Sequence, residues 1–238
     1  MINLDVRRPS MRKTPLVNNQ IYHVFNRGVD RRNVFLGKYD LDRFLLCLSE
    51  FNNLEPIGSI YEQSFRKKGD SGASSLGRPT SKLVEVVAYC LNPNHFHLIL
   101  QQKTEGGISE FMKRLLGGYT KYFNLKNERT GALFQGKFKA VHINNDNYLY
   151  HLSTYVNLNN QVHKIKTGYC SSWEEYMGKE GLCDKTMILS HFPGIEAYEK
   201  FALEQLQKTL ETRGEINDFE FEKPKKSLRR SLGRRTSK

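Results

Sequence analysis

Two histidines, His95 and His97, stand one residue apart in a stretch that opens with a turn signal and ends in an apolar run, "NPNHFHLIL". Side chains of a β-strand alternate between its two faces, so both imidazoles share one face while Phe96 and Leu98 take the other. Neutral imidazole is the commonest metal ligand among side chains. The pair therefore predicts a point at which one divalent ion could be bound.

A second pair of polar residues, Tyr155 and Asn159, lies further along the chain in "STYVNLNN". Residues four apart on a helix project from the same face, one turn from each other. The Asn carbonyl oxygen suits Mg²⁺ or Mn²⁺, and two imidazoles with one amide oxygen leave positions on an octahedral ion that suit phosphate oxygens. Beside such an ion, the phenol oxygen could attack a phosphodiester and conserve its bond energy in a covalent phosphotyrosine.

Each pair also has an ordinary structural explanation. Histidines near strand ends are often hydrogen-bonded without a metal, and Tyr155 could pack beside Leu152 and Val156 on a helix. From spacing alone, packing is the stronger interpretation of Tyr155. Two other histidines have ordinary roles: His23 is expected to be a hydrogen-bonded structural residue, and His151 is expected to be a surface residue.

The elements that must position these side chains can be placed from apolar periodicity. A hairpin is predicted from a strand over residues 83–91, the turn at Pro93 and Asn94, and the histidine strand. Four residues of its first strand are expected to form one apolar face: Val84, Val86, Ala88 and Cys90.

The other predicted elements flank this hairpin. Paired glycines at 117 and 118 weaken the middle of one helix and indicate a close approach or a bend, and Asn144 or Asn145 can cap another. The elements are a strand over 21–26, an extended basic segment over 133–143 with a strand at its end, and helices over 39–51, 108–127, 145–159 and 195–212.

The composition of the 238 residues, 38% of them hydrophobic, is typical of a globular protein. No run approaches the roughly 18 apolar residues of a membrane span, and the first residues are polar, so a cytoplasmic protein without membrane contact is expected. The four cysteines form no C-x-x-C pair and predict free thiols. Residues 62–82 are rich in Gly and Ser and are interpreted as a flexible insertion.

The net charge of +12 is concentrated in two places. Residues 223–238 hold eight basic residues and no acid, and residues 111–140 hold seven against one acid, with aromatic residues between them. This pattern favours binding of a nucleic-acid backbone, although a charged segment can also be only solvated. The candidate phosphate contacts are Arg27, Arg31, Arg32, Arg114, Lys121, Arg129, Lys137 and Lys139.

Four motifs in order, "NPNHFHLIL", "GGYTKYFN", "RTGALFQGKFKA" and "YVNLNN", resemble the REP-associated tyrosine transposases, which are single-tyrosine HUH transposases. The opening "IYHVFNRGVDRRNVFL" also resembles that family, and the likeness covers about residues 12–176. The resemblance implies that His95 and His97 bind a divalent metal, Mg²⁺ or Mn²⁺, with Asn159 as third ligand. It implies Tyr155 as the nucleophile. One departure is Asn160, where the family often has a proline.

The resemblance further implies an α+β fold, a ferredoxin- or RRM-like sandwich with a central antiparallel sheet flanked by helices. Its expected activity is cleavage and strand transfer on single-stranded or hairpin DNA through a 5′-phosphotyrosine. The expected organisation is a catalytic domain over 1–176, a C-terminal helical extension over 177–222 and a basic flexible tail over 223–238. The oligomeric state is left open between monomer and homodimer.

Three alternatives are retained. The main one is a non-catalytic, RRM-like protein that binds single-stranded nucleic acid with structural histidines. Another HUH enzyme, such as a replication initiator or relaxase, fits the late single tyrosine less well. A zinc hydrolase lacks a third His, Cys or acidic ligand at a persuasive spacing.

Overall fold

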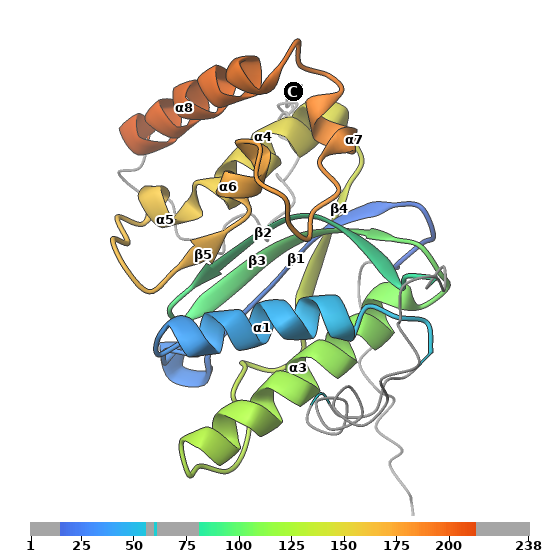
Figure 1. The fold of residues 1–238 in the computed structure, drawn as a ribbon, viewed down its shortest axis with the longest axis vertical. Coiled ribbons are helices and arrows are strands. Elements are labelled where there is room, and N and C mark those ends of the chain that lie inside the picture. The colour runs from blue at the N-terminus through green and yellow to red at the C-terminus, as the bar shows by residue number, and fades with distance from the viewer. Residues whose placement is uncertain (1–14, 56–59, 61–80, 213–238) are drawn as a thin grey trace, which may run out of the picture.

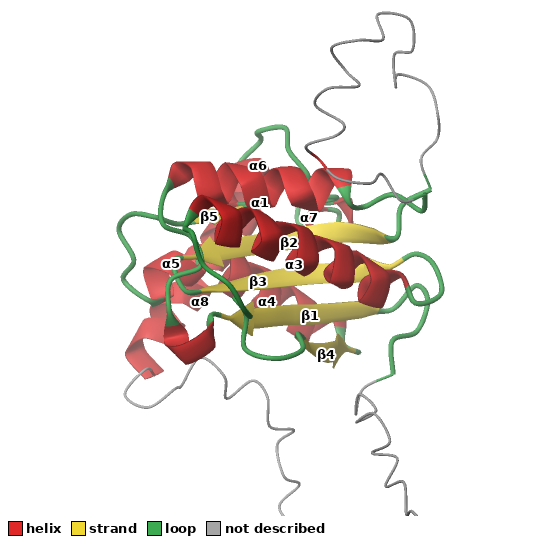
Figure 2. Ribbon diagram, turned by 90° about the horizontal axis from the view of Figure 1, so that it is seen from below, coloured by secondary structure: helices red, strands yellow, loops and turns green. Residues whose placement is uncertain are grey.

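The structure is a computed structural model that describes residues 15–55, 60 and 81–212. Within these residues the chain forms a five-stranded antiparallel sheet in the order β4-β1-β3-β2-β5 (Figures 1 and 2). The strands are β1 Ile21–Arg27, β2 Val84–Asn92, β3 His95–Gln102, β4 Lys139–Ile143 and β5 Cys170–Ser171. Most of the predicted insertion, the first 14 residues and the basic tail lie outside the described residues.

The first four strands and two helices have the connectivity of a ferredoxin-like fold. Helix α1, Lys38–Glu50, connects β1 to β2, and helix α3, Gly107–Lys126, connects β3 to β4. The order β4-β1-β3-β2 with this ββ hairpin between two helices is the βαββαβ arrangement. The expected α+β fold is therefore confirmed.

Helices α1 and α3 cover one face of the sheet, below it in Figure 1. Their apolar stripes and the inward side chains of β2 and β3 form the first core cluster, in which Phe44, Phe96, Phe111 and Tyr119 are completely buried. The predicted close approach at the paired glycines is confirmed for Gly118, since a Cβ there would lie 2.5 Å from the ring of Phe51. Gly117, its neighbour, has nothing within 4 Å of such a Cβ.

These two glycines give a matched test of helix packing. Gly118→Ala is expected to destabilise the protein relative to Gly117→Ala by about 1–3 kcal/mol, because the added methyl group overpacks against buried Phe51. Gly117→Ala should be neutral or stabilising by about 0.5–1 kcal/mol, since alanine favours the helix. Urea denaturation of both variants measures the difference. Equal free energies of unfolding would contradict the close packing of α1 and α3.

Strand β2 does not keep one apolar face. A β-bulge shifts its register against β3 between Val86 and Ala88. Val84 and Val86 therefore lie in the first cluster, whereas Ala88 and Cys90 lie on the opposite, histidine-bearing face. The predicted single face of these four residues is wrong, because one extra residue in a strand inverts the alternation beyond it.

The second face of the sheet is covered by helices that follow β4 (Figure 1). Asn145 caps the first of them by accepting a hydrogen bond from the Tyr148 backbone nitrogen at 3.1 Å. These helices are α4 Asp146–Asn157, α5 Asn159–Val162, α6 Trp173–Tyr176, α7 Thr186–Leu189 and α8 Ile195–Thr212.

A buried polar network fastens α4 to its surroundings. The Tyr198 hydroxyl of α8 lies 3.1 Å from Ser153 Oγ and accepts from Asn157 Nδ2 at 2.9 Å. Asn157 Oδ1 accepts from Ser172 Oγ, and that hydroxyl accepts from the Tyr89 backbone nitrogen in β2. Hydrogen-bonded groups in a dry interior fix orientation as well as contributing stability, so α4 has one defined position over the sheet.

Two simpler expectations can also be checked in the described residues. Their four cysteines are all free, Cys47 and Cys90 being buried and Cys170 and Cys183 half-buried. Among the helices of this part of the chain, none has the length and apolar character needed to span a membrane.

Candidate active site

The two histidines of β3 lie on the side of the sheet beneath α4. His95 and His97 are 7% and 2% exposed, their ring centroids are 5.1 Å apart and the ring planes are nearly perpendicular. Burial lowers the pKa of His97 well below its ordinary value of 6.5, and the neighbouring histidines lower it further. His97 is therefore a neutral imidazole, the form that binds metal ions.

The protonated nitrogen of His95 is fixed by its neighbour Asn94. His95 Nδ1 lies 2.6 Å from Asn94 Oδ1. An amide oxygen can only accept, so the hydrogen is on Nδ1 and the lone pair is on Nε2. That lone pair faces Asn92 Nδ2, 3.0 Å away.

Asn92 joins His95 to Asn159. Its side chain is completely buried opposite His95 in the β2–β3 hairpin, and its Nδ2 also donates to Asn159 Oδ1 at 2.5 Å. Two acceptor atoms, one from β3 and one from α5, thus point at the same amide nitrogen. These two atoms, His95 Nε2 and Asn159 Oδ1, are the ones through which the two residues would hold a cation.

The predicted helix from 145 to 159 is interrupted just before Asn159. Helix α4 ends at Asn157, Leu158 has φ −109° and ψ 17°, and Asn159 is the first residue of α5. Leu158 itself is buried in the second core cluster. The prediction of one continuous helix up to about Asn159 is therefore wrong, because the helix breaks at Leu158. Asn159 nevertheless lies close to His95, to which Asn92 connects it.

Tyr155 projects from α4 toward the same face. Its ring is half-buried and meets the ring of His97 edge to face, with centroids 5.9 Å apart. It also packs at the margin of the second core cluster, which contains Leu152 and Val156. Tyr155 therefore both packs against the second core cluster and lies close to the histidine pair.

A divalent cation fits this donor set. In the described ranges, the buried His97 Nε2 has no hydrogen-bond partner. The same ranges contain no cluster of three His, Cys, Asp or Glu side chains suited to a metal, so the available donors are two imidazoles and an amide oxygen. Two imidazoles and one carbonyl oxygen would fill three positions of an octahedral divalent ion and leave the others for further ligands.

Three residues around the pair escaped prediction or were incompletely placed. His163, whose ring lies 5.4 Å from that of His95, was missed; its signal is the repeat of four residues from Tyr155 through Asn159. Asn92 was also missed. His23 is a buried hydrogen-bonded histidine as expected, and its partner is His97, with His23 Nε2 2.9 Å from His97 Nδ1.

Some of the predicted phosphate contacts gather at this end of the sheet. Arg27 pairs with His95 across the β1–β3 ladder, and Lys139 Nζ lies 6.0 Å from the ring of Phe25, which itself contacts His97. Exposed Arg31 and Arg32 lie in the turn after β1, where the Arg31 carbonyl accepts from Asn94 Nδ2. These four cations thus lie near the histidine hairpin.

The remaining predicted contacts lie elsewhere or bind within the fold. Arg114 pairs with Glu110 at 2.8 Å and donates to the Asn53 carbonyl at 2.7 Å, which holds α3 against the end of α1. Arg129 donates to Asn124 Oδ1 and to the Ala132 carbonyl. Exposed Lys121 is on α3, across the sheet from the histidines, and Lys137 is exposed before β4.

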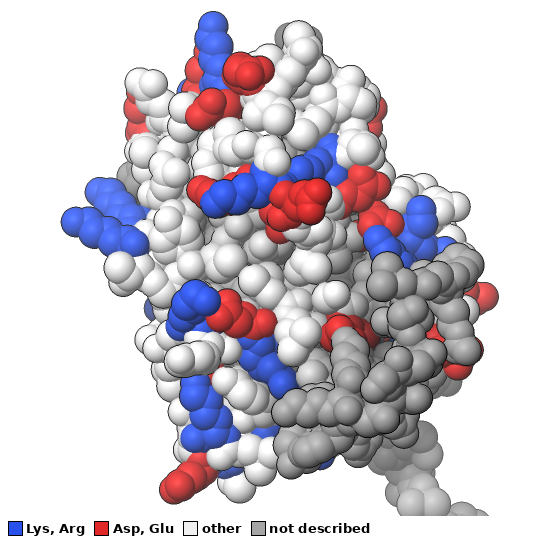
Figure 3. Space-filling model, in the orientation of Figure 1, with Lys and Arg blue, Asp and Glu red and all other residues white. Residues whose placement is uncertain are grey.

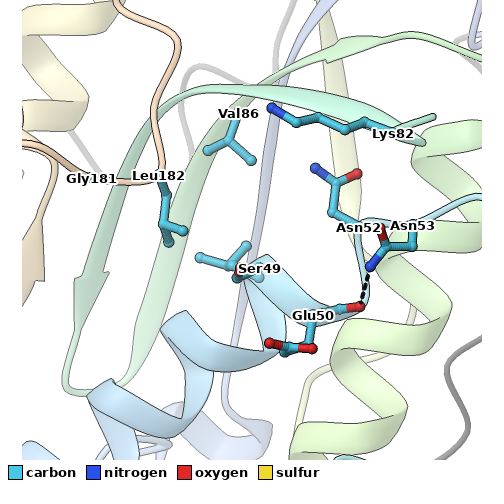
Figure 4. A pocket seen from close by; sticks show the side chains of 9 residues that line it. Ser49, Glu50, Asn52, Asn53, Lys82, Val86, Gly181 and Leu182 are labelled. Carbon is cyan, nitrogen blue, oxygen red and sulfur yellow. Dashed lines mark hydrogen bonds between the residues drawn. The ribbon is translucent and has the colours of Figure 1, made fainter. Parts of the chain in front are cut away.

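Basic and acidic side chains alternate on the face seen in Figure 3, so this view contains no wholly basic surface. A cavity of about 320 Å³ lies on the other side of the sheet, between the end of α1 and β2 (Figure 4). Its lining includes Ser49, Asn52, Lys82 and Leu182 and contains none of the histidines. It is separate from the candidate active site.

In a comparison with known protein families, the central part of the chain matches one family. Residues 78–159 match the family described as "Transposase IS200 like". This span contains His95, His97, Tyr155 and Asn159, and it confirms the resemblance expected from the motifs. No curated protein matches the sequence.

Among solved structures, the chain is similar to a REP-associated tyrosine transposase bound to a REP hairpin. The two chains are 14% identical, with a TM-score of 0.44, and the similarity covers 71% of this chain and 86% of that one.

Proposed function

We propose, from the match of residues 78–159 to the IS200-like transposase family, that the protein is a metal-dependent endonuclease and strand transferase of single-stranded DNA. Its substrate would be a hairpin or palindromic DNA with a single-stranded flank. Tyr155 is the proposed nucleophile, and His95, His97 and Asn159 are the proposed ligands of Mg²⁺ or Mn²⁺.

The observation that carries this proposal is the convergence of two distant segments on one face of the sheet. Tyr155 contacts the ring of His97, and Asn159 is joined to His95 through the single amide nitrogen of Asn92. A packing role alone explains the half-buried tyrosine. It does not explain why His95, His97 and Asn159, from two distant segments of the chain, are all buried in the same region of the fold.

The proposed reaction needs one nucleophile and one leaving group. The Tyr155 Oη attacks the phosphorus and loses its proton, an Oη–P bond forms to the 5′-phosphate of the downstream fragment, and the P–O3′ bond to the upstream fragment breaks as its 3′ oxygen gains a proton. Because the phosphate ester bond is conserved, the free 3′-hydroxyl can attack the phosphotyrosine and reverse the step without a nucleotide cofactor. The bound cation would polarise the phosphoryl oxygens and neutralise developing charge.

Binding of the DNA strand is assigned to the cations nearest the histidine hairpin. Arg27, Arg31, Arg32 and Lys139 lie near that hairpin and would contact the phosphates on either side of the cleaved bond. Arg114 is occupied by Glu110 and backbone carbonyls, so no role at the cleaved bond is proposed for it. The localisation in the cytoplasm and the division into catalytic domain, helical extension and tail are proposed on the sequence alone.

The test is a covalent adduct that depends on metal. Wild-type protein, Mn²⁺ and a labelled hairpin with a single-stranded flank should yield a protein–DNA species that survives denaturing electrophoresis. Chelation with EDTA is expected to reduce it by about 100-fold or more, since a Lewis acid supplies several kcal/mol to such a reaction. The duplex form of the same sequence is the matched control.

An adduct that is undiminished in EDTA would contradict metal dependence. No adduct at all, with the hairpin still bound, would favour the alternative of an RRM-like protein that binds nucleic acid without cleaving it.

A further inference from the structure

His23 on β1 lies beside His97 of β3, and the two side chains share one face of the sheet. His23 Nε2 and His97 Nδ1 are 2.9 Å apart, the rings are stacked with centroids 5.1 Å apart, and both side chains are at most 2% exposed. The match to the transposase family begins at residue 78, so His23 lies outside it.

The contact between the two rings can be made in two ways. Each neutral imidazole has one N–H donor and one acceptor nitrogen, so exactly one of the two facing nitrogens carries the hydrogen. If His23 Nε2 is the donor, His97 must carry its own hydrogen on Nε2. If His97 Nδ1 is the donor, its Nε2 has a free lone pair.

Only the second arrangement leaves a metal ligand. Across the described residues, His97 Nε2 and His23 Nδ1 are buried atoms that lack a hydrogen-bond partner. A cation could bind His97 Nε2 only if that nitrogen carries a lone pair, as it does in the second arrangement. In the first arrangement, His97 Nε2 would instead present a buried N–H to the cation. His95 has the same pattern already fixed, because Asn94 Oδ1 accepts from its Nδ1 and the lone pair on its Nε2 faces Asn92 Nδ2.

We propose that His23 is a positioning residue that accepts a hydrogen bond from His97 Nδ1 and thereby directs the His97 Nε2 lone pair to the divalent cation. This inference rests on the proposed function, since it needs a metal at His97. Such outer partners of a metal-bound histidine fix its tautomer and ring orientation, and their loss typically weakens metal binding about 10–100-fold.

Metal affinity in two variants tests the proposal. In His23→Leu the acceptor is removed, and the Mn²⁺ dissociation constant, measured by electron paramagnetic resonance, is expected to rise about 10–100-fold. In His23→Gln the amide oxygen can still accept from His97 Nδ1, so the constant should stay within a few-fold of wild type. Circular dichroism melting of both variants reports whether the fold is kept. If His23 only filled space, the Gln variant would not be expected to keep a Mn²⁺ affinity that the Leu variant loses.

A second measurement uses the unaltered protein. Nitrogen-15 NMR of the wild type with Mg²⁺ should find the hydrogen on His97 Nδ1 and none on His23 Nε2. The reverse tautomers, or a folded His23→Leu protein with wild-type Mn²⁺ affinity, would overturn the role of His23 and leave the proposed function intact. A wild-type protein that binds neither cation would overturn both.

Discussion

Tyr155→Phe is expected to abolish the covalent protein–DNA adduct while hairpin binding and stability remain close to wild type. The phenyl ring keeps the edge contact with His97 and the packing at the second core cluster. It lacks the oxygen that must bond to phosphorus. Adduct formation should therefore fall by roughly 10³-fold or more, as expected when a covalent nucleophile is removed. Denaturing electrophoresis with a labelled hairpin measures the adduct, and gel shift measures binding.

Tyr150→Phe provides the matched control. Tyr150 is on the same helix, but its ring lies 5.1 Å from that of His191 and away from the histidine pair. This variant should form the adduct at the wild-type rate. If both variants retain it, the nucleophile is another residue; if Tyr150→Phe alone loses it, the assignment to Tyr155 is refuted.

His97→Gln is expected to have the second largest effect, on metal binding. The substitution removes Nε2, a buried nitrogen without a partner in the described part of the chain, and retains much of the side-chain volume. Loss of a direct ligand should weaken Mn²⁺ binding by more than the roughly 10–100-fold that loss of an outer partner costs. The adduct should decrease in parallel and recover in part at high Mn²⁺ concentration. Titration calorimetry and the adduct assay measure the two effects.

His151→Gln is the control for this variant. His151 is exposed on α4, as expected from the sequence, and its ring packs against Phe201. Its loss should leave Mn²⁺ affinity unchanged. Equal Mn²⁺ affinity in the His97 and His151 variants would assign the metal to other donors.

The fold follows closely from local patterns in the sequence. Alternation of apolar residues places both imidazoles on one face of β3, and the helical stripes of α1 and α3 locate the opposite core. The bulge between Val86 and Ala88 was not predictable, because residues 86–91 are all apolar and all buried, on both faces of β2. Periodicity carries information only where one face is polar.

The bulge also explains why part of the site escaped prediction. Without it, Asn92 would face α1 and α3; with it, Asn92 faces His95 and Asn159. His23 reaches His97 through the pairing of β1 with β3, which depends on residues far apart in the chain. Sequence spacing places residues within one element, as for Tyr155 and Asn159, but it does not give the register between elements.

The basic residues illustrate the same limit. Charge alone predicted Arg114 as a phosphate contact with the same weight as Arg27. In the fold, Arg114 is held by Glu110 and by the Asn53 carbonyl, whereas Arg27 lies opposite His95. Which cations reach the site is decided by the position of their elements on the two faces of the sheet.

The central claim is that one phenol oxygen, Tyr155 Oη, becomes bonded to the DNA phosphate beside the histidine pair. Tandem mass spectrometry of the digested adduct, formed with Mn²⁺ and the hairpin substrate, locates that bond directly. We expect the nucleotide mass on the peptide that contains Tyr155 and on that side chain. The modification on any other residue, or a cleaved DNA strand with no modified peptide, would contradict the claim.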